Sequence, residues 1–169
     1  MSLQQKYSKE IKQILSKYPP EYKRSAVMPI LHLVQKDEGH ISKESMQEIA
    51  ALLDITETEV ASVVGFYTLY QEKKAGKYRM QICTDLPCAL RGADDFFKQV
   101  CDHLNVKDGE TTEDGLVTVE HVMCLAGCDR APMFQEQGPD GIKYHEYMTI
   151  ERVDEWLQSL KQLEAGEKR

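Results

Sequence analysis

Four of the five cysteines in the 169-residue chain occur as two close pairs, and their spacing constrains the fold more than any other feature. Cys83 and Cys88 are separated by four residues, and Cys124 and Cys128 by three. Each pair directly follows a segment whose residues are typical of a β-strand. If these two strands are neighbours in one sheet, both loops open at the same edge, and the four sulfur atoms can converge on one centre.

The donor set limits the chemistry that such a centre can have. Four thiolates without a histidine suit either an iron–sulfur cluster or a tetrahedral zinc ion. Zinc ribbons usually have two residues between paired cysteines, whereas these spacers are longer and unequal. In a [2Fe-2S] cluster each of the two iron ions is held by its own pair of ligands. The two pairs are therefore apart, and longer, unequal spacers are easier to accommodate. The residues therefore favour a [2Fe-2S] cluster on Cys83, Cys88, Cys124 and Cys128, with zinc and thiol redox chemistry left open.

Cys101 and His121 are two further residues with metal-binding chemistry in this part of the chain. Cys101 lies one helical turn after Phe97, which predicts a packed thiol rather than a fifth ligand. His121 precedes Cys124 by three residues, and we interpret it as a half-exposed strand residue. The remaining histidines are scattered and form no metal-binding spacing.

Residues 1–75 have the periodicity of helices joined by short turns. Apolar residues recur every three or four positions over 3–18, which predicts a first helix with one apolar face. A second helix is expected over about 21–35, with a kink at Pro29.

Capping residues mark the starts of two further helices. Ser42 is placed to cap a helix over 43–53, and Thr56 with Glu59 forms a capping box for the next helix. The segment at the end of that helix is richly apolar, and we expect Phe66 in it to lie in the core.

From residue 77 the apolar period shifts toward two and glycine becomes frequent, which indicates strands alternating with helices. The expected strands cover 77–82, 115–122, 133–137 and 142–147, and the expected helices cover 89–104 and 149–160. The last two strands flank a glycine-containing hairpin loop. The fold class is therefore α+β, with a helical subdomain over 1–75 and an α/β domain over 76–169.

The charge of the chain argues against nucleic acid as a partner. The chain contains 21 basic and 28 acidic residues, which gives a net charge of −7. The two signs balance in 1–75, so the acidic surplus falls entirely in 76–169, and no basic stripe is present.

The sequence predicts neither a membrane span nor secretion. No apolar run approaches the roughly 20 residues that cross a bilayer, and the N-terminus lacks the apolar stretch of a signal peptide. We therefore expect a cytoplasmic protein. In that reducing compartment, an odd number of cysteines does not indicate a disulfide framework.

The two cysteine loops closely resemble those of a known family. The runs Cys83–Ala93 and Cys124–Pro132 are similar to the thioredoxin-like [2Fe-2S] ferredoxins, which include the E-type [2Fe-2S] subunit of NADH:quinone oxidoreductase (respiratory complex I). The helical part carries matching segments at Tyr18–Pro19, Arg24–Ala26, Leu31–Gln35, Gly39–Ser42 and Phe66–Tyr70. The resemblance extends over about 18–160, and the paired cysteine spacing is its most specific part.

This resemblance implies a helical N-terminal bundle followed by a thioredoxin-like domain with a four-stranded sheet and a [2Fe-2S] cluster near the surface. It implies an electron-carrier subunit of NADH:quinone oxidoreductase, with no catalytic residues of its own. The implied partners are the flavoprotein subunit that binds FMN and NADH and other peripheral-arm subunits. Association with the cytoplasmic face of the inner membrane would then be indirect. NADH is not expected to bind here, since the sequence has no G-x-G-x-x-G motif.

Other functions remain open at this point. The resemblance also fits the equivalent diaphorase subunit of a soluble NAD-linked hydrogenase or formate dehydrogenase. A zinc-stapled interaction module is the alternative from a different class. Thiol–disulfide exchange would require a C-x2-C motif, which neither cysteine pair forms.

The sequence departs from the family pattern in two places. Members commonly have Leu-Gly after the third cysteine, whereas here Leu125 is followed by Ala126, and glycine comes one place later, at Gly127. We expect Gly127 to let the backbone approach the sulfur atoms, and the changed order to alter which amides point at them. The loop over 137–141 is also longer than is usual in the family.

Overall fold

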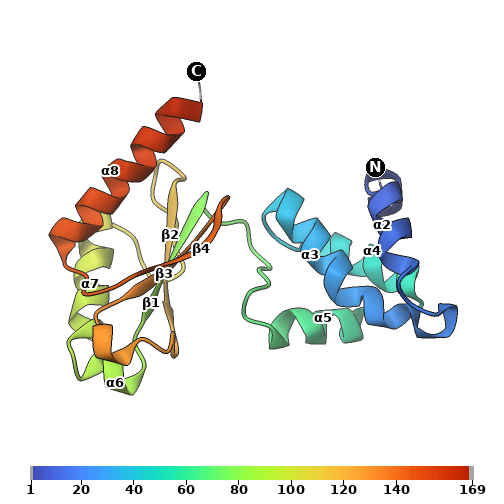
Figure 1. The fold of residues 1–169 in the computed structure, drawn as a ribbon, viewed down its shortest axis with the longest axis horizontal. Helices are drawn as coiled ribbons and strands as arrows, with labels where there is room; N and C mark the ends of the chain where they lie inside the picture. The colour runs from blue at the N-terminus through green and yellow to red at the C-terminus, as the bar shows by residue number, and fades with distance from the viewer. Residues whose placement is uncertain (1, 168–169) are drawn as a thin grey trace. The chain divides into compact units, whose positions relative to one another are not determined.

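The structure is a computed structural model that describes residues 2–167, and it contains two compact units (Figure 1). Unit 1 comprises the residues up to Lys74, and unit 2 begins at Ala75. Unit 1 is built from helices, whereas unit 2 combines a four-stranded sheet with helices. Among the described residues, no helix is both long and apolar enough to cross a membrane.

Unit 1 consists of short helices joined by tight turns. In chain order they are α1 (Leu3–Lys6), α2 (Ser8–Leu15), the 3-10 helix η1 (Pro20–Ala26), α3 (Val27–Glu38), α4 (Lys43–Leu53) and α5 (Glu57–Phe66). The helix expected over 3–18 is interrupted at Tyr7, whose backbone leaves the helical region, and it ends at Leu15. The kink expected at Pro29 is wrong. Because α3 begins at Val27, Pro29 falls in its first turn, where the missing amide hydrogen is not needed.

The starts of α4 and α5 confirm the capping residues predicted from the sequence. Ser42 Oγ accepts a hydrogen bond from the Ser45 amide (3.1 Å). Thr56 Oγ1 accepts one from the Glu59 amide (3.2 Å), and Glu59 Oε2 accepts one from the Thr56 amide (2.9 Å). Caps of this kind each contribute about 1 kcal/mol. The Thr56 amide is also the main reason why the pKa of Glu59 lies below its usual value.

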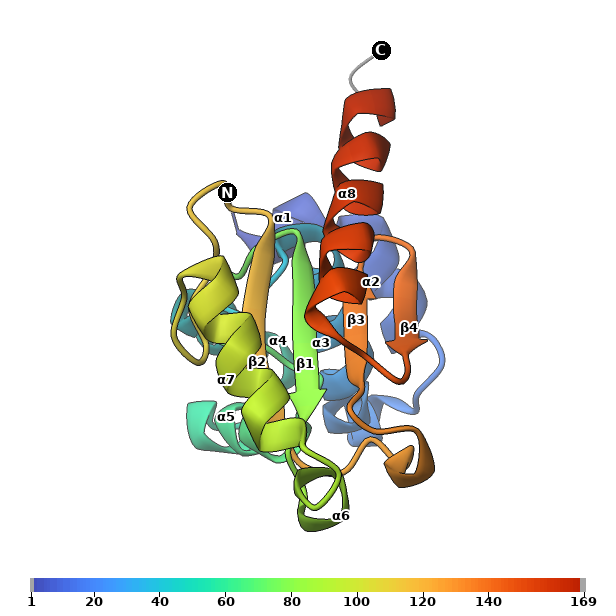
Figure 2. The same ribbon diagram turned by 90° about the vertical axis from the view of Figure 1, so that its left-hand side faces the viewer.

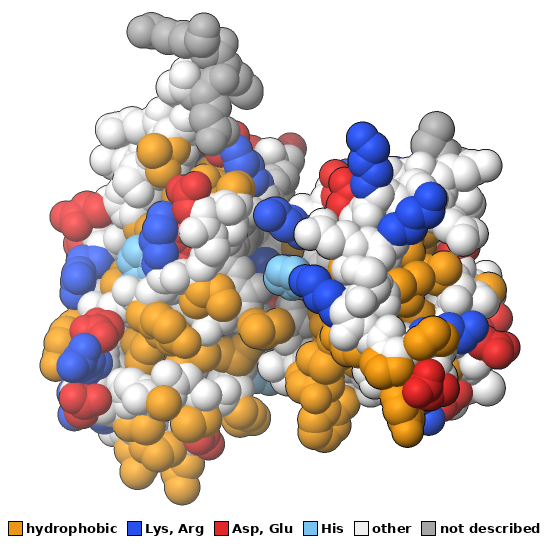
Figure 3. Space-filling model, turned by 45° about the vertical axis from the view of Figure 1, so that its right-hand side comes forward, with side chains coloured by type: hydrophobic (Ala, Val, Ile, Leu, Met, Phe, Trp, Pro, Cys, Tyr) orange, Lys and Arg blue, Asp and Glu red, His pale blue; other side chains and the backbone are white. Residues whose placement is uncertain are grey.

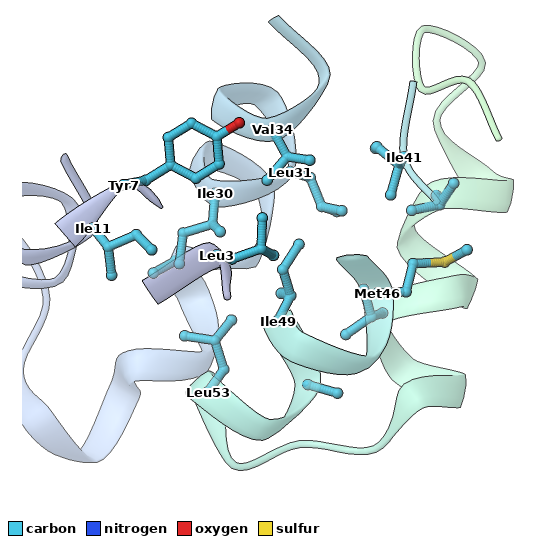
Figure 4. Close-up of a cluster of buried hydrophobic side chains, with 14 residues drawn as sticks. Leu3, Tyr7, Ile11, Ile30, Leu31, Val34, Ile41, Met46, Ile49 and Leu53 are labelled. Carbon is cyan, nitrogen blue, oxygen red and sulfur yellow. The ribbon is translucent and has the colours of Figure 1, made fainter. Parts of the chain in front are cut away.

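Aliphatic side chains from α1 to α4 point toward one another and form the core of unit 1 (Figure 4). Ile30 and Leu31 of α3, Ile49 and Leu53 of α4 and Ile41 of the intervening turn are at most 1% exposed. Burial of each such side chain contributes about 1.5–3 kcal/mol, so this cluster holds the short helices together.

The prediction that Phe66 lies in the core is wrong, because its side chain is 77% exposed. The buried residues of α5 are Val60 and Val64, which are four positions apart and therefore lie on one face of the helix. Phe66 follows Val64 by two positions and lies on the opposite face. Its apolar character predicted burial, but the helical phase directs the ring outward.

Unit 2 contains a four-stranded mixed sheet with α7 and α8 on one face (Figure 2). The strand order is β2-β1-β3-β4. β1 is parallel to β2, and β3 is antiparallel to both β1 and β4. The arrangement confirms the predicted α+β class. In chain order the elements are β1 (Tyr78–Cys83), α6 (Leu86–Ala89), α7 (Ala93–Leu104), β2 (Val117–Val122), η2 (Cys128–Arg130), β3 (Phe134–Gly138), β4 (Gly141–His145) and α8 (Ile150–Glu167).

Several boundaries in unit 2 differ from the sequence prediction. The helix expected over 89–104 is two helices, because Gly92 adopts φ 87° between α6 and α7, a conformation that costs glycine least. The last helix continues past residue 160 to Glu167. The hairpin between the last two strands is confirmed, since β3 and β4 pair up to Gly138 and Gly141.

Side chains alternate across the sheet and create one apolar face, which α7 and α8 cover. Met80 and Ile82 of β1 are fully buried on this face. They belong to one cluster with Phe96 and Val100 of α7 and with Trp156 of α8. This cluster positions β1, the strand that ends at the first predicted ligand.

The opposite face of the sheet is held by a network of side-chain amides. Gln81 Oε1 accepts hydrogen bonds from Gln135 Nε2 (3.1 Å) and Gln137 Nε2 (2.8 Å), both on β3. Gln81 Nε2 donates to Glu120 Oε2 on β2 (3.0 Å). Cys83 follows Gln81 by two residues and so shares its face. The network therefore ties three strands together near the end of β1.

One carboxylate is buried on the helix-covered face. Glu136 of β3 is 3% exposed, and its Oε2 accepts hydrogen bonds from Trp156 Nε1 and His145 Nε2, each 2.8 Å long. Lys143 Nζ lies 3.6 Å from the other oxygen. Burial raises the pKa of Glu136, but the two hydrogen bonds and the Lys143 charge outweigh it and hold the pKa below its usual value. Since an ionised carboxylate only accepts, His145 carries a hydrogen on Nε2.

We expect Glu136→Gln to lower the free energy of unfolding of unit 2 by about 1–3 kcal/mol, because a buried partner loses its charge-assisted hydrogen bond. The lowered pKa means that ionised Glu136 adds stability above the ordinary glutamate pKa of about 4.3, and that this contribution is lost as the pH falls through the folded-state value. Denaturant unfolding followed by the fluorescence of Trp156, the only tryptophan, measures both effects. Equal stability of the two proteins at neutral pH would contradict the expectation.

Candidate metal centre

The two cysteine-bearing loops leave the sheet at the same edge, as the sequence pattern predicts. Cys83 is the last residue of β1 and pairs in register with Val122, the last residue of β2. Because β1 and β2 are parallel, their carboxyl ends coincide. One hydrogen bond continues the β1–β2 pairing beyond the ladder, from Thr84 N to Val122 O (3.0 Å). On the other side of β1, Cys83 N donates to Met133 O, just before β3 (3.3 Å).

The loop after β1 turns Cys88 into the interior. Asp85 Oδ1 accepts a hydrogen bond from the Leu86 amide (2.9 Å) and begins the single turn of α6. The Cys88 amide donates to Asp85 O (2.8 Å), which closes that turn. Cys88 on this turn and Cys83 at the end of β1 are both buried.

The loop after β2 has an uncommon backbone conformation. Cys124 (φ 29°) and Ala126 (φ 57°) both have positive φ values, which residues other than glycine rarely adopt. Within residues 2–167, the amides of 124–127 donate no hydrogen bond to the protein. Successive amides that remain free in such a loop can donate to a negatively charged group. Cys124 itself is exposed, and Cys128, at the start of η2, is half-buried.

Three of the four predicted ligands lie in contact. Cys83 and Cys88 belong to one buried cluster, and Cys128 packs against that cluster. Cys124 is exposed and lies on the same loop as Cys128. Within residues 2–167, no three histidine, cysteine, aspartate or glutamate side chains are already close enough together to hold a metal ion. The structure therefore brings both loops together, while the ligand role of the four cysteines stays a prediction.

The environment of Cys88 argues against a redox-active thiol. Burial, and secondly the neighbouring Cys83 and Cys128, raise the pKa of Cys88 to about 12. Thiol–disulfide exchange needs an accessible thiol with a lowered pKa. A bound metal cation, by contrast, favours the thiolate form and removes the repulsion between neighbouring sulfur atoms.

Small and flexible side chains form the wall behind the buried thiols. Ala93, at the start of α7, packs with Ala131 and Met133 against Cys83 and Cys88. Met133 is only 2% exposed. Met133 falls in a segment predicted as a strand, 133–137, but its contact with the buried thiols was not predictable, because it depends on tertiary packing.

Gly127 lies so close to Met133 that a side chain at position 127 would require the end of the Met133 side chain to move. A Cβ at position 127 would lie 2.3 Å from Met133 Sδ, so the lack of a side chain makes room for the wall. The positive φ that usually favours glycine falls instead on Ala126. With glycine at 126 the left-handed conformation would be unstrained, but a larger residue at 127 would collide with Met133. The order Ala126-Gly127 accepts the strain at Ala126 and leaves space beside Met133.

The other two candidates from the sequence have different environments. Cys101 is half-buried and packs with Phe97 against the core of unit 2, which confirms the predicted packed thiol. His121 is exposed, and its Nδ1 lies 2.8 Å from Asp108 Oδ2. Neither residue belongs to the buried cluster around Cys88.

Comparison with known proteins identifies the family. The family model described as thioredoxin-like [2Fe-2S] ferredoxin matches residues 11–161, which is most of the chain. This chain belongs to the thioredoxin-like [2Fe-2S] ferredoxin family. The comparison confirms the resemblance recognised in the cysteine loops and the thioredoxin-like fold inferred from it.

Several relatives in this ferredoxin family are subunits of one type of enzyme. NADH-quinone oxidoreductase subunit 2 of Thermus thermophilus is 40% identical over 151 residues, which cover 89% of this chain and 82% of the relative. The E-type subunit of the NADH-quinone oxidoreductase of Rickettsia bellii is 35% identical over 149 residues, covering 88% and 87%. The E-type subunit from Mycobacterium tuberculosis is 37% identical over 141 residues, covering 79% of this chain, which spans about half (55%) of that relative.

Solved structures with the same fold include an NAD+-reducing [NiFe]-hydrogenase. Its crystal structure in the H2-reduced state matches with a TM-score of 0.62 and 16% identity, over 80% of this chain and 22% of that chain. The air-oxidised state matches with a TM-score of 0.63. At this level of identity the likeness concerns the fold alone.

The ferredoxin family is defined by a [2Fe-2S] cluster, and the residues around Cys88 fit this cofactor. Thiolate sulfur is its ligand type, and Cys128 packs against the buried cluster that contains Cys83 and Cys88. The free amides of 124–127 are donors of the kind that surrounds sulfur ligands. Cys124 lies on that same loop and provides a fourth thiol.

We expect Ala126 and Gly127 of this loop to respond differently to exchange between alanine and glycine. Ala126→Gly relieves a left-handed alanine and should change the free energy of unfolding by no more than about 1 kcal/mol. Gly127→Ala displaces the buried Met133 and should lower it by about 1–3 kcal/mol. Denaturant unfolding of the metal-free chain measures both variants. A larger loss for Ala126→Gly than for Gly127→Ala would show that the loop is not organised in this way.

Proposed function

We propose that this chain is an electron-carrier subunit of an NADH:quinone oxidoreductase and that Cys83, Cys88, Cys124 and Cys128 hold its [2Fe-2S] cluster. The cluster exchanges electrons with the FMN of a partner flavoprotein subunit. The main support is the parallel pairing of β1 with β2, which brings two cysteine loops to one edge of a sheet in a chain that is 40% identical to a subunit of such an enzyme.

The residues of the chain have distinct roles in this proposal. When bound, the cluster takes up and releases one electron at a time. Cys83 and Cys88 supply thiolates from the protein interior, where Met133, Ala93 and Ala131 exclude water. Cys124 and Cys128 supply thiolates from the loop after β2. The free amides of 124–127 stabilise negative charge, which increases on reduction.

The charge of unit 2 acts in the opposite direction. Residues 76–169 contain 18 acidic and 11 basic side chains, and this surplus disfavours additional negative charge. It therefore lowers the reduction potential, although salt screens the exposed charges.

Other subunits supply the remaining steps in this proposal. NADH binds to the flavoprotein, since the chain has no dinucleotide-binding motif. Other peripheral-arm subunits connect the chain to the cytoplasmic face of the inner membrane, so that its membrane association is indirect. Nucleic acid is not a partner of this acidic chain.

The alternative functions have less support. A diaphorase subunit of a soluble hydrogenase or formate dehydrogenase rests on a fold likeness at 16% identity, whereas oxidoreductase subunits are 35% to 40% identical over most of the chain. A zinc-stapled module does not agree with the [2Fe-2S] family model that matches residues 11–161.

Replacement of individual cysteines tests the ligand assignment. We expect alanine at position 83, 88, 124 or 128 to lower the iron and acid-labile sulfide content by more than about tenfold, since even outer-shell substitutions cost about 10- to 100-fold in metal affinity. Visible absorbance and the EPR signal of the reduced state should fall in parallel. All proteins are purified anaerobically and analysed for iron, sulfide and zinc.

Cys101→Ala is the matched control, because Cys101 is a cysteine of unit 2 that lies outside both loops. It should keep its iron, its absorbance and its EPR signal. Retention of the cluster in any of the four ligand variants would remove that residue from the assignment. Stoichiometric zinc in the unmodified chain, without an EPR signal on reduction, would overturn the proposed function.

A further inference from the structure

The second cysteine loop has few anchors of its own. Hydrophobic side chains gather at the lower end of unit 2 in Figure 3, the end at which Figure 1 shows α6, so charged groups offer little support there. In the described part of the chain, the amides of 124–127 donate no hydrogen bond to the protein. The loop is fastened instead to the residues that follow it, since Arg130 N donates to Gly127 O (2.9 Å). We call residues 130–132 the anchor segment, and the position of Cys128 depends on what holds it.

Two backbone hydrogen bonds fasten the anchor segment to the connection between β4 and α8. Tyr147 N donates to Arg130 O (2.8 Å). Met148 N, in the next peptide group, donates to Pro132 O (2.8 Å). This connection thus holds the segment that directly follows the proposed ligand Cys128.

The same two peptide groups accept hydrogen bonds from one side chain, that of Arg152. Arg152 Nη1 donates to Glu146 O (2.6 Å) and to Tyr147 O (2.7 Å). The carbonyl of Glu146 shares a peptide group with the amide of Tyr147, and the carbonyl of Tyr147 shares one with the amide of Met148. Each peptide group therefore accepts from Arg152 on one side and donates to the anchor segment on the other. A charged donor polarises these peptide groups and strengthens the hydrogen bonds that their amides donate.

The place of Arg152 in the sequence is unusual for its charge. Because α8 begins at Ile150, Arg152 lies in the first turn, where the helix dipole disfavours a basic side chain. Helical side chains slant toward the N-terminus, and the guanidinium accordingly reaches the carbonyls before the helix. Tyr147, between these bonds, has a φ of 52°, a value that costs free energy in residues other than glycine. The hydrogen bonds that Arg152 and the anchor segment make with Tyr147 offset both penalties.

A surface ion pair contributes less to this arrangement. Arg130 Nη1 lies 2.6 Å from Glu146 Oε1, but the two side chains are 50% and 35% exposed. Solvent and salt weaken exposed ion pairs, whereas the acceptors of Arg152 are uncharged carbonyl groups. Arg152 is thus the stronger of the two connections.

We propose that Arg152 is a positioning residue for the second cysteine loop and that it sets how firmly Cys128 holds the cluster. The inference rests on the proposed function. Arg152 acts through two peptide groups and the anchor segment, so the loop keeps its place while the amides of 124–127 remain available to sulfur. Loss of the donors lets Cys128 move and speeds the release of iron.

Cluster loss and amide exchange test this role. Arg152→Met keeps the apolar stem and removes the donors. It should speed the loss of visible absorbance in the presence of an iron chelator by at least about fivefold, since outer-shell substitutions weaken metal sites. In the anaerobically purified chain, the amide hydrogens of Tyr147 and Met148 should exchange with deuterium at least about tenfold faster, as read by mass spectrometry. An effect on α8 alone would leave the rate of cluster loss unchanged.

Two further variants separate these hydrogen bonds from other effects. Arg152→Lys restores one nitrogen with enough hydrogens for both carbonyl groups and should keep both rates within about twofold of those of the unmodified chain. Asp154→Ala is the matched control, because Asp154 is a charged residue of α8 whose Oδ1 lies 2.7 Å from Nε2 of His103 on α7, away from the anchor segment. It should also leave both rates within about twofold.

Four results would overturn the positioning role. They are unchanged rates in Arg152→Met, faster amide exchange without faster cluster loss, equal effects of Arg152→Met and Asp154→Ala, and an Arg152→Lys variant that behaves like Arg152→Met. Iron content is measured first. Absence of iron from the unmodified chain overturns the proposed function, and the exchange rates alone then decide whether Arg152 holds the loop in place.

Discussion

The parallel pairing of β1 with β2 is the constraint on which the rest of the site depends. A parallel pair requires a crossover, and here α6 and α7 lead the chain from the end of β1 back to the start of β2. Both strands therefore end at the same edge, and each continues directly into a cysteine loop. A shift of one residue in the register would turn Cys83 toward the apolar face covered by α7 and α8. The hydrogen bonds of Gln81 to β2 and β3, together with the burial of Met80 and Ile82, oppose such a shift.

The single turn of α6 positions one of the proposed ligands. Its N-cap, Asp85, starts the turn, and the turn buries Cys88 while it exposes Leu86 and Leu90. The same short segment thus fixes the burial of the proposed ligand Cys88 and the exposure of two leucines.

Features that depend on neighbouring residues in the sequence were predictable. The caps at Ser42 and Thr56 are local hydrogen bonds, and the structure contains both. The strands before the two cysteine pairs were predictable from their composition, and the paired spacing indicated the centre and the family. Features that depend on packing were not: Phe66 is exposed because of the phase of α5, and Pro29 is harmless because of where α3 begins. Met133 lay in a predicted strand, and Gly127 was expected to approach the sulfur atoms. Its close approach is to Met133 instead, and a contact of this kind depends on packing.

Diffraction from crystals of the anaerobically purified chain, collected at the iron absorption edge, tests the central claim most directly. We predict two adjacent iron peaks at the shared edge of β1 and β2, with sulfur from Cys83, Cys88, Cys124 and Cys128 bonded to them. A single zinc ion at this position, or iron bound without Cys124, would contradict the proposed four-cysteine cluster.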